Sequence, residues 1–162
     1  MVKPTSIERE QILAMSPENY MNPVQKDFFR RLIRSDRQDV INHIEQMKQQ
    51  LQDNPETGDE GDIALREEHL RLIFRQIDRE SRLLPKYDAA LMRLETGEYG
   101  FCRDTGEAIG LQRLLLRPTA ELSIEAKTKQ EKVEVQYRKN NAVVQAMDRA
   151  GMRVTLRSGR YQ

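Results

Sequence analysis

Cys102 and Thr105 stand in a glycine-punctuated segment, YGFCRDTGEAIG (residues 99–110), where a zinc knuckle would place two metal ligands. Seventeen residues separate Thr105 from Ser123, and Ala126 follows three positions later. This is the ligand spacing of a four-cysteine zinc site with three of its four sulfurs absent. Because hydroxyl and methyl groups do not replace thiolates around tetrahedral zinc, we expect no zinc and no other bound metal here.

Cys102 is the only cysteine of the chain, and its side chain has two possible roles. An unpaired intracellular cysteine is usually a small buried hydrophobe. A redox-sensitive thiol needs a lowered pKa, which a sequence does not reveal. Without a metal, packing must hold the knuckle together. The apolar residues expected to provide it are Phe101, Ile109, Leu111, Leu114, Leu116, Leu122 and Ile124.

A second group of reactive side chains lies in DNPETGDEGD, residues 53–62, which carries five carboxylates and no basic residue. Asp59 or Asp62 can cap a following helix, whose positive dipole end favours acids. Alternatively, carboxylates at the end of a long rigid rod can be delivered to a metal or basic site inside a partner. Both interpretations stay open at the level of these residues.

A long helix precedes this acidic segment. Asn22 can cap it, and Pro23 suits its first position, where a missing N–H costs nothing. Apolar residues then recur at alternating spacings of three and four, the coiled-coil period, interrupted only by Arg37. The seam consists of Phe29, Ile33, Val40, Ile44, Met47 and Leu51.

A similar seam follows the acidic segment and ends before Gly97. It consists of Ile63, Leu70, Phe74, Ile77, Leu84, Leu91 and Leu94. An antiparallel turn at residues 57–58 fits a single register, which pairs Leu51 with Ile63, Ile44 with Leu70 and Val40 with Phe74. We therefore predict a helical hairpin with arms of about 22 residues, roughly 33 Å long. Pro85 predicts a kink in the second arm, because a proline inside a helix costs about 3 kcal/mol.

Shorter elements complete the chain. Thr5 and Glu8 form a T-x-x-E capping box, which predicts a short N-terminal helix. A third long helix is expected from Ser123 up to Gly151. The histidines His43 and His69 would lie far out on the hairpin, so they do not supply the missing zinc ligands.

Composition favours an elongated molecule. Of 162 residues, 38% are hydrophobic and 33% are charged, and the net charge is +1, so no global charge marks a dedicated nucleic-acid binder. No apolar run approaches the roughly 20 residues of a membrane span, and we expect a soluble, cytoplasmic protein without a membrane partner.

The predicted fold class is mainly α: a long antiparallel coiled-coil hairpin plus a small globular domain with a degenerate zinc-finger knuckle and a C-terminal helix. Residues 1–21 form a helical segment of the globular part, and residues 22–96 form the hairpin, with its tip at 52–62. Residues 97–139 form the knuckle and the start of the C-terminal helix. Residues 140–162 hold the end of that helix and a basic tail.

Three segments together resemble the DksA/TraR family of bacterial RNA polymerase regulators. YMNPVQKDFFRRLI (20–33) resembles the family's entry into its coiled coil, and DEGDIA (59–64) fits its D-x-x-D-x-A tip motif at Asp59, Asp62 and Ala64. LETGEYGFCRDTGEAIGLQRLLLRPTAELSIEAK (94–127) is similar to its zinc-finger segment. Family members with a C-x-x-T…S-x-x-A knuckle occur, so the resemblance implies a zinc-independent form.

The resemblance also implies a function. The hairpin would enter the secondary channel of RNA polymerase and place its tip near the catalytic magnesium. Together with guanosine tetraphosphate (ppGpp), the protein would inhibit ribosomal RNA promoters and activate some biosynthetic ones in the stringent response. The family's ppGpp-binding positions correspond to Lys86, Arg117 and Lys127. We expect no enzyme activity, no sequence-specific DNA binding and a monomer.

Three other functions remain open. A Gre-type transcript-cleavage factor also carries an acidic helical hairpin into the same channel, where its carboxylates help a metal activate water. A degenerate zinc ribbon could bind nucleic-acid phosphates through Arg113, Arg117, Lys127, Lys129 and Lys132. The third is a purely structural coiled coil.

Overall fold

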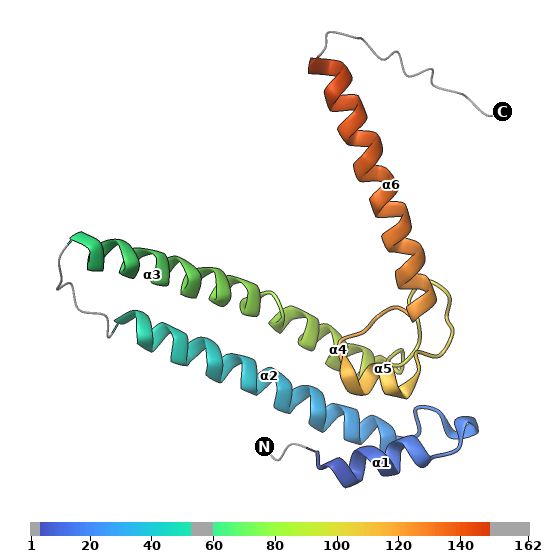
Figure 1. Ribbon diagram of the computed structural model, residues 1–162. Coiled ribbons are helices and arrows are strands. Elements are labelled where there is room, and N and C mark those ends of the chain that lie inside the picture. The colour runs from blue at the N-terminus through green and yellow to red at the C-terminus, as the bar shows by residue number, and fades with distance from the viewer. Residues whose placement is uncertain (1–3, 53–59, 150–162) are drawn as a thin grey trace.

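The computed structural model describes residues 4–52 and 60–149 of the chain. Its elements are α1 (Ser6–Ala14), a short 3₁₀ helix (Pro17–Asn19), α2 (Pro23–Gln52), α3 (Glu60–Ser81), α4 (Leu84–Thr96), α5 (Leu111–Leu116) and α6 (Ile124–Arg149). In Figure 1, α2 runs antiparallel beside α3 and α4, α1 and α5 lie at the base of this hairpin, and α6 extends away from the base. The predicted mainly α fold, with a long helical hairpin and a C-terminal helix, is confirmed.

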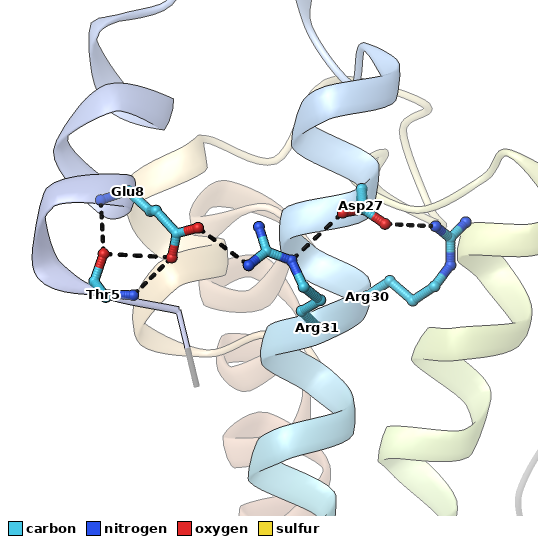
Figure 2. Close-up of polar contacts among 5 residues, drawn as sticks. All are labelled: Thr5, Glu8, Asp27, Arg30 and Arg31. Carbon is cyan, nitrogen blue, oxygen red and sulfur yellow. Dashed lines mark hydrogen bonds and ion pairs between the residues drawn. The ribbon is translucent and has the colours of Figure 1, made fainter. Parts of the chain in front are cut away.

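The N-terminal helix α1 begins with the predicted capping box. The Glu8 amide donates to Thr5 Oγ1 at 3.3 Å, and the Thr5 amide donates to Glu8 Oε2 at 2.8 Å. Arg31 of α2 donates to Glu8 Oε1 at 3.1 Å and pairs with Asp27 at 3.4 Å, as Figure 2 shows. The Thr5 amide and the Arg31 guanidinium lower the pKa of Glu8. One carboxylate therefore caps α1 and also joins it to α2.

The main hydrophobic core lies where α2 meets α4 at the base of the hairpin. Asn22 caps α2 as predicted, because its Oδ1 accepts from the Gln25 amide at 2.8 Å. Gln25 is itself buried, and its Oε1 accepts from the Met21 amide at 2.7 Å. The largest buried apolar side chains of this core are Phe28, Phe29, Leu32, Ile33, Leu94, Tyr99, Ile109 and Leu114.

A second, smaller core joins α2 to α3 farther along the hairpin. Ile44, Met47 and Ile73 are buried in it. The sequence-based seam of the second arm was wrong at two positions, because Phe74 is 59% exposed and Ile63 is 40% exposed. Each residue of a helix turns the side-chain direction by about 100°, so a seam through Ile73 directs Phe74 away from α2.

The predicted hairpin register was also wrong. It would place Arg71 opposite His43, whereas His43 Nδ1 lies 2.9 Å from both carboxylate oxygens of Glu80. Nearer the base, Arg37 Nε donates to Asp88 Oδ1 at 2.8 Å. These two contacts lie on opposite sides of an interruption between α3 and α4, so one linear register does not describe the whole second arm.

That interruption is the kink predicted at Pro85. The second arm divides into α3, which ends at Ser81, and α4, which begins at Leu84. The Leu83 amide donates to the Glu80 carbonyl at 2.8 Å, a three-residue bond that tightens the chain at the break. Pro85 occupies the first turn of α4, where its missing N–H is tolerated. Lys86 therefore lies at the start of a new helix.

The knuckle between α4 and α5 is a small loop with a single antiparallel bridge between Phe101 and Ala108. The Cys102 amide donates to the Glu107 carbonyl at 2.7 Å, and the Gly106 amide donates back to the Cys102 carbonyl at 2.8 Å. Gly100 has φ +92, and an added Cβ there would lie 2.6 Å from the Met21 side chain. The knuckle thus packs directly against the segment that precedes α2.

Packing inside the knuckle only partly follows the predicted apolar set. Ile109 and Leu114 are completely buried, and Leu111 and Leu122 are partly buried. The prediction was wrong for Leu116 and Ile124, which are 89% and 64% exposed, whereas Phe101 is partly exposed but its ring packs edge-on against Tyr20, with the ring centroids 5.5 Å apart. Short turns and bends displace the apolar period, so one face of α5 and the first residue of α6 point to solvent.

Two tyrosines outside the predicted set complete the knuckle. The Tyr20 hydroxyl donates to the carbonyls of Gly100, at 2.7 Å, and Ile109. The buried Tyr99 hydroxyl donates to the Pro118 carbonyl at 2.8 Å. Burial raises the pKa of Tyr20 to about 12. The Gly100 carbonyl also accepts from the Ile109 amide, so the phenols chiefly supply partners for the carbonyls of Ile109 and Pro118.

Candidate functional site: a degenerate knuckle beside a cationic cleft

The four degenerate zinc-site positions meet where the knuckle touches the start of α6. Cys102 is 3% exposed, and its Sγ accepts from the Ser123 amide at 3.4 Å. Ser123 Oγ in turn accepts from the Ala126 amide at 3.2 Å and so caps α6. Thr105 and Ala126 line one hollow on the same side of α6. The spacing read from the sequence therefore corresponds to a real spatial cluster.

Hydrogen bonds to Cys102 favour its thiolate. Burial raises the pKa of this thiol, but the Thr105 side chain and the amides of Ser123, Thr105 and Asp104 outweigh burial and lower it to about 6. Cys102 is therefore buried, as expected of a packing cysteine, and also has the lowered pKa that a reactive thiol requires. Its small exposed fraction limits the access of reagents.

Zinc does not fit the donor set of this cluster. Structural zinc is held by four thiolate or imidazole ligands, whereas this cluster offers one sulfur, two hydroxyls and a methyl group. Within residues 4–52 and 60–149, no group of three or more His, Cys, Asp or Glu side chains has a geometry suited to a metal ion. We derive no role for zinc from these residues.

A cleft of about 240 Å³ lies beside the knuckle and collects basic side chains from four parts of the fold. Lys86 comes from the first turn of α4, Arg103 from the knuckle, Arg113 and Arg117 from α5 and its C-terminal cap, and Lys127 from the first turn of α6. The three positions singled out from the sequence, Lys86, Arg117 and Lys127, therefore line one cleft. The chain between Lys86 and Arg117 forms most of α4, the knuckle and α5, and it folds back so that these side chains meet.

The electrostatics of the cleft are strongly positive. Among its lining residues, Glu121 is the one acid beside five cations. Arg103 pairs with Glu121 at 3.0 Å, and Arg113 Nε donates to the Leu122 carbonyl at 3.1 Å. Lys86 and Arg117 make no ion pair within the described part of the chain. Such a concave group of guanidinium and ammonium groups is suited to a polyanion, above all to phosphates.

Sequence reasoning missed part of this cleft. The sequence indicates Arg113 only as a possible nucleic-acid contact and gives no sign that Arg103 lies in a site. Neither has a local pattern that marks it, because only the fold of residues 97–123 brings them beside Lys86. Lys129, which was grouped with Arg113, instead lines the hollow of Thr105 and Ala126.

The acidic tip is only partly described. Asp59 lies outside the described residues, whereas Asp62 and Ala64 fall in the first turns of α3. Their proposed roles stay predictions. The hairpin that carries them has a first arm of 30 residues, which at 1.5 Å per residue is about 45 Å long.

Hydropathy adds one finding: none of the helices described here is long and apolar enough to cross a membrane.

Fold and site together define a class of protein: an acidic-tipped helical hairpin on a base that contains a degenerate zinc-finger knuckle. Two family models match the chain: DnaK suppressor protein DksA, N-terminal domain, over residues 25–94, and prokaryotic dksA/traR C4-type zinc finger over residues 97–132. The chain belongs to the DksA/TraR family. With a single cysteine, the chain lacks three of the four thiolates of a C4-type finger.

Two curated relatives of this chain share one description. The RNA polymerase-binding transcription factor DksA of Caulobacter vibrioides is 35% identical over 133 residues, which cover 82% of this chain and 94% of the relative. The protein of the same description from Escherichia coli K12 is 36% identical over 112 residues, which cover 68% of this chain and 74% of that protein. The structure of transcription factor DksA2 from Pseudomonas aeruginosa matches with a TM-score of 0.71 and 50% identity, covering 78% of this chain and 98% of that one.

Proposed function

We propose that this protein is a transcription regulator that binds RNA polymerase and has no catalytic activity of its own. The observation that carries the proposal is the match to the Caulobacter vibrioides factor, which spans 94% of a protein described as RNA polymerase-binding. Both the hairpin and the knuckle of this chain fall within family matches, so the likeness is not confined to one module.

The hairpin is the part that would act on the polymerase. We propose that it enters the secondary channel and brings Asp59, Asp62 and Ala64 near the catalytic magnesium, where it changes the stability of initiation complexes. The length of α2 supports this proposal, because a hairpin that merely turns needs no such reach. The net effect would be inhibition of ribosomal RNA promoters and activation of some biosynthetic promoters.

The cationic cleft is the proposed site for ppGpp, with Lys86, Arg117 and Lys127 on its phosphates. Its volume of about 240 Å³ is below the roughly 300–1,000 Å³ of ordinary small-molecule pockets. The cleft therefore has room for phosphate groups more readily than for a complete nucleotide. This size supports a site completed by the polymerase surface, with the nucleoside lying against the partner.

The remaining parts of the proposal concern the location of the protein, its oligomeric state, and its contacts with DNA and zinc. The protein would act as a cytoplasmic monomer, without sequence-specific contacts to DNA and without zinc. Packing of Ile109 and Leu114 together with the Tyr20 and Tyr99 hydrogen bonds supports a knuckle that is stable without metal.

In vitro transcription from a ribosomal RNA promoter, with and without ppGpp, tests the proposal. Wild-type protein should inhibit, and inhibition should deepen with ppGpp. Asp59→Asn should lose most inhibition, while Lys127→Ala should lose mainly the response to ppGpp. Glu45→Gln and Lys132→Ala are matched controls, because both residues are exposed on the helices and neither lines the cleft.

Equal transcription with all variants, at every protein concentration, would contradict the proposed function. A second assay covers the cleavage alternative. Backtracked elongation complexes should release no short 3′ RNA when the protein is added. Rapid release of such fragments would identify a cleavage factor instead.

A further inference from the structure

The ion pair between Arg103 and Glu121 lies in the wall of the cationic cleft. Arg103 Nη1 and Glu121 Oε2 are 3.0 Å apart, and both residues line the cleft. Separately, the Arg103 amide donates to the Glu121 carbonyl at 2.9 Å. The two residues are thus joined once through side chains and once through backbone.

We propose that Arg103 is a specificity-determining residue of the cleft and that Glu121 is an internal competitor that a polyphosphate displaces from it. This inference rests on the proposed function of the cleft as the ppGpp site. In the free protein the Glu121 carboxylate neutralises Arg103. A bound ligand replaces this carboxylate with a phosphate oxygen.

Exposure makes this exchange easy. The Arg103 and Glu121 side chains are 68% and 38% exposed, and ion pairs of that exposure contribute little to stability. A phosphate group offers more negative charge than a carboxylate and matches the guanidinium fork equally well. Arg103 therefore interacts more favourably with a ligand that carries several phosphates than with the Glu121 carboxylate.

The backbone contact keeps Arg103 in place during the exchange. The hydrogen bond from the Arg103 amide to the Glu121 carbonyl does not involve either charged group. Breaking the side-chain ion pair therefore leaves the knuckle closed. Arg113 is similarly fixed, because its Nε donates to the Leu122 carbonyl and leaves its other N–H groups for a ligand. Only the Glu121 carboxylate has to move.

Ligand charge should decide which anions benefit. Displacing Glu121 from Arg103 costs the same for any anion, whereas the attraction of the freed guanidinium grows with the charge of the ligand, so a tripolyphosphate offsets that cost more readily than a single phosphate. The pair therefore makes the cleft selective for chains of phosphates, and the four cations that remain hold the rest of the ligand.

Calorimetric titration of the full chain with inorganic tripolyphosphate, and with phosphate for comparison, tests this inference. Arg103→Gln should weaken tripolyphosphate binding by about threefold to fivefold, the effect of one exposed ion pair, and phosphate binding less. Arg103→Lys should recover part of the loss. Arg71→Gln is the matched control, because Arg71 is an exposed, ion-paired arginine of α3 outside the cleft.

A double-mutant cycle separates competition from a structural role. Glu121→Gln should strengthen tripolyphosphate binding about threefold to fivefold in the wild-type background and less in the Arg103→Gln background, where no ion pair has to be broken. Equal gains in both backgrounds would overturn the inference. The inference would also fail if Arg103→Gln and Arg71→Gln bound tripolyphosphate equally tightly. It would fail as well if the wild-type chain did not bind tripolyphosphate.

The outcomes also separate this inference from the proposed function. If Lys127→Ala abolishes tripolyphosphate binding but Arg103→Gln does not weaken it, the inference fails and the effector site stands. If the double-mutant cycle behaves as expected but ppGpp does not alter transcription, the inference stands as a property of the cleft and the proposed effector role fails.

Discussion

Replacing Leu114 tests whether packing, and not metal, holds the knuckle together. Leu114 lies on α5 and is 0% exposed, whereas Leu116, two positions later on the same short helix, is 89% exposed. Truncating a fully buried leucine to alanine typically costs about 2–5 kcal/mol of unfolding free energy. Leu116→Ala should change it by no more than about 0.5 kcal/mol.

Thermal unfolding turns this difference into a measurement. For a chain of about this length, 1 kcal/mol shifts Tm by roughly 2–4 °C, so Leu114→Ala should lower Tm by at least about 4 °C. Near-UV circular dichroism is the appropriate signal, because Tyr20 and Tyr99 both bond to knuckle carbonyls and report on this region. The far-UV helical signal is less suitable, because much of it comes from the distal hairpin and does not report on the knuckle.

A chelator provides the second arm of the experiment. Structural zinc contributes directly to folding, so its removal from a zinc-dependent knuckle lowers Tm. Here a strong zinc chelator should leave the Tm of wild type, Leu114→Ala and Leu116→Ala unchanged. A chelator-induced loss of stability, or equal shifts for the two leucine variants, would refute the reasoning that packing has replaced the metal.

Three further predictions concern the same region. Gly100→Ala should destabilise more than Gly97→Ala, because both glycines have positive φ but only at Gly100 would the new Cβ collide with a side chain; the difference in urea unfolding free energy measures this. Thiolate absorbance of Cys102 should titrate with a midpoint near pH 6 in the folded protein, whereas a midpoint near 9 would show that its hydrogen bonds do not favour the thiolate. The raised pKa of Tyr20 means that the folded state prefers the protonated phenol, so its contribution to stability is complete below pH 10 and is lost as pH rises through about 12. Unfolding free energies of wild type and Tyr20→Phe between pH 9 and 12 should therefore converge as pH rises, and parallel curves would contradict this assignment.

Local signals in the sequence were sufficient for the helices. Thr5 with Glu8, and Asn22 with Pro23, mark helix starts that the structure reproduces, because capping depends on neighbours within one turn. Pro85 likewise marked the break between α3 and α4 through its missing N–H. The hairpin itself followed from two apolar seams of coiled-coil period.

Register was less predictable. Phe74 and Ile73 are adjacent and similarly apolar, so periodicity alone did not decide which of them faces α2. The choice depends on how the two arms meet and on the break before Pro85, which changes the alignment along the second arm. Leu116 shows the same limit, because its exposure depends on the orientation of a single short helix.

For the candidate site, the sequence determined the chemistry and the fold determined the assembly. The spacing of Cys102, Thr105, Ser123 and Ala126 showed that zinc lacks its thiolates, since ligand type is a property of the residues themselves. Only tertiary structure showed that hydrogen bonds lower the pKa of Cys102 and that Arg103 joins the cleft. The pKa of Cys102 depends on the turn that directs Thr105 and Asp104 toward the sulfur and on the approach of Ser123, and the cleft depends on packing that brings Arg103 beside Lys86, so neither follows from residue types alone.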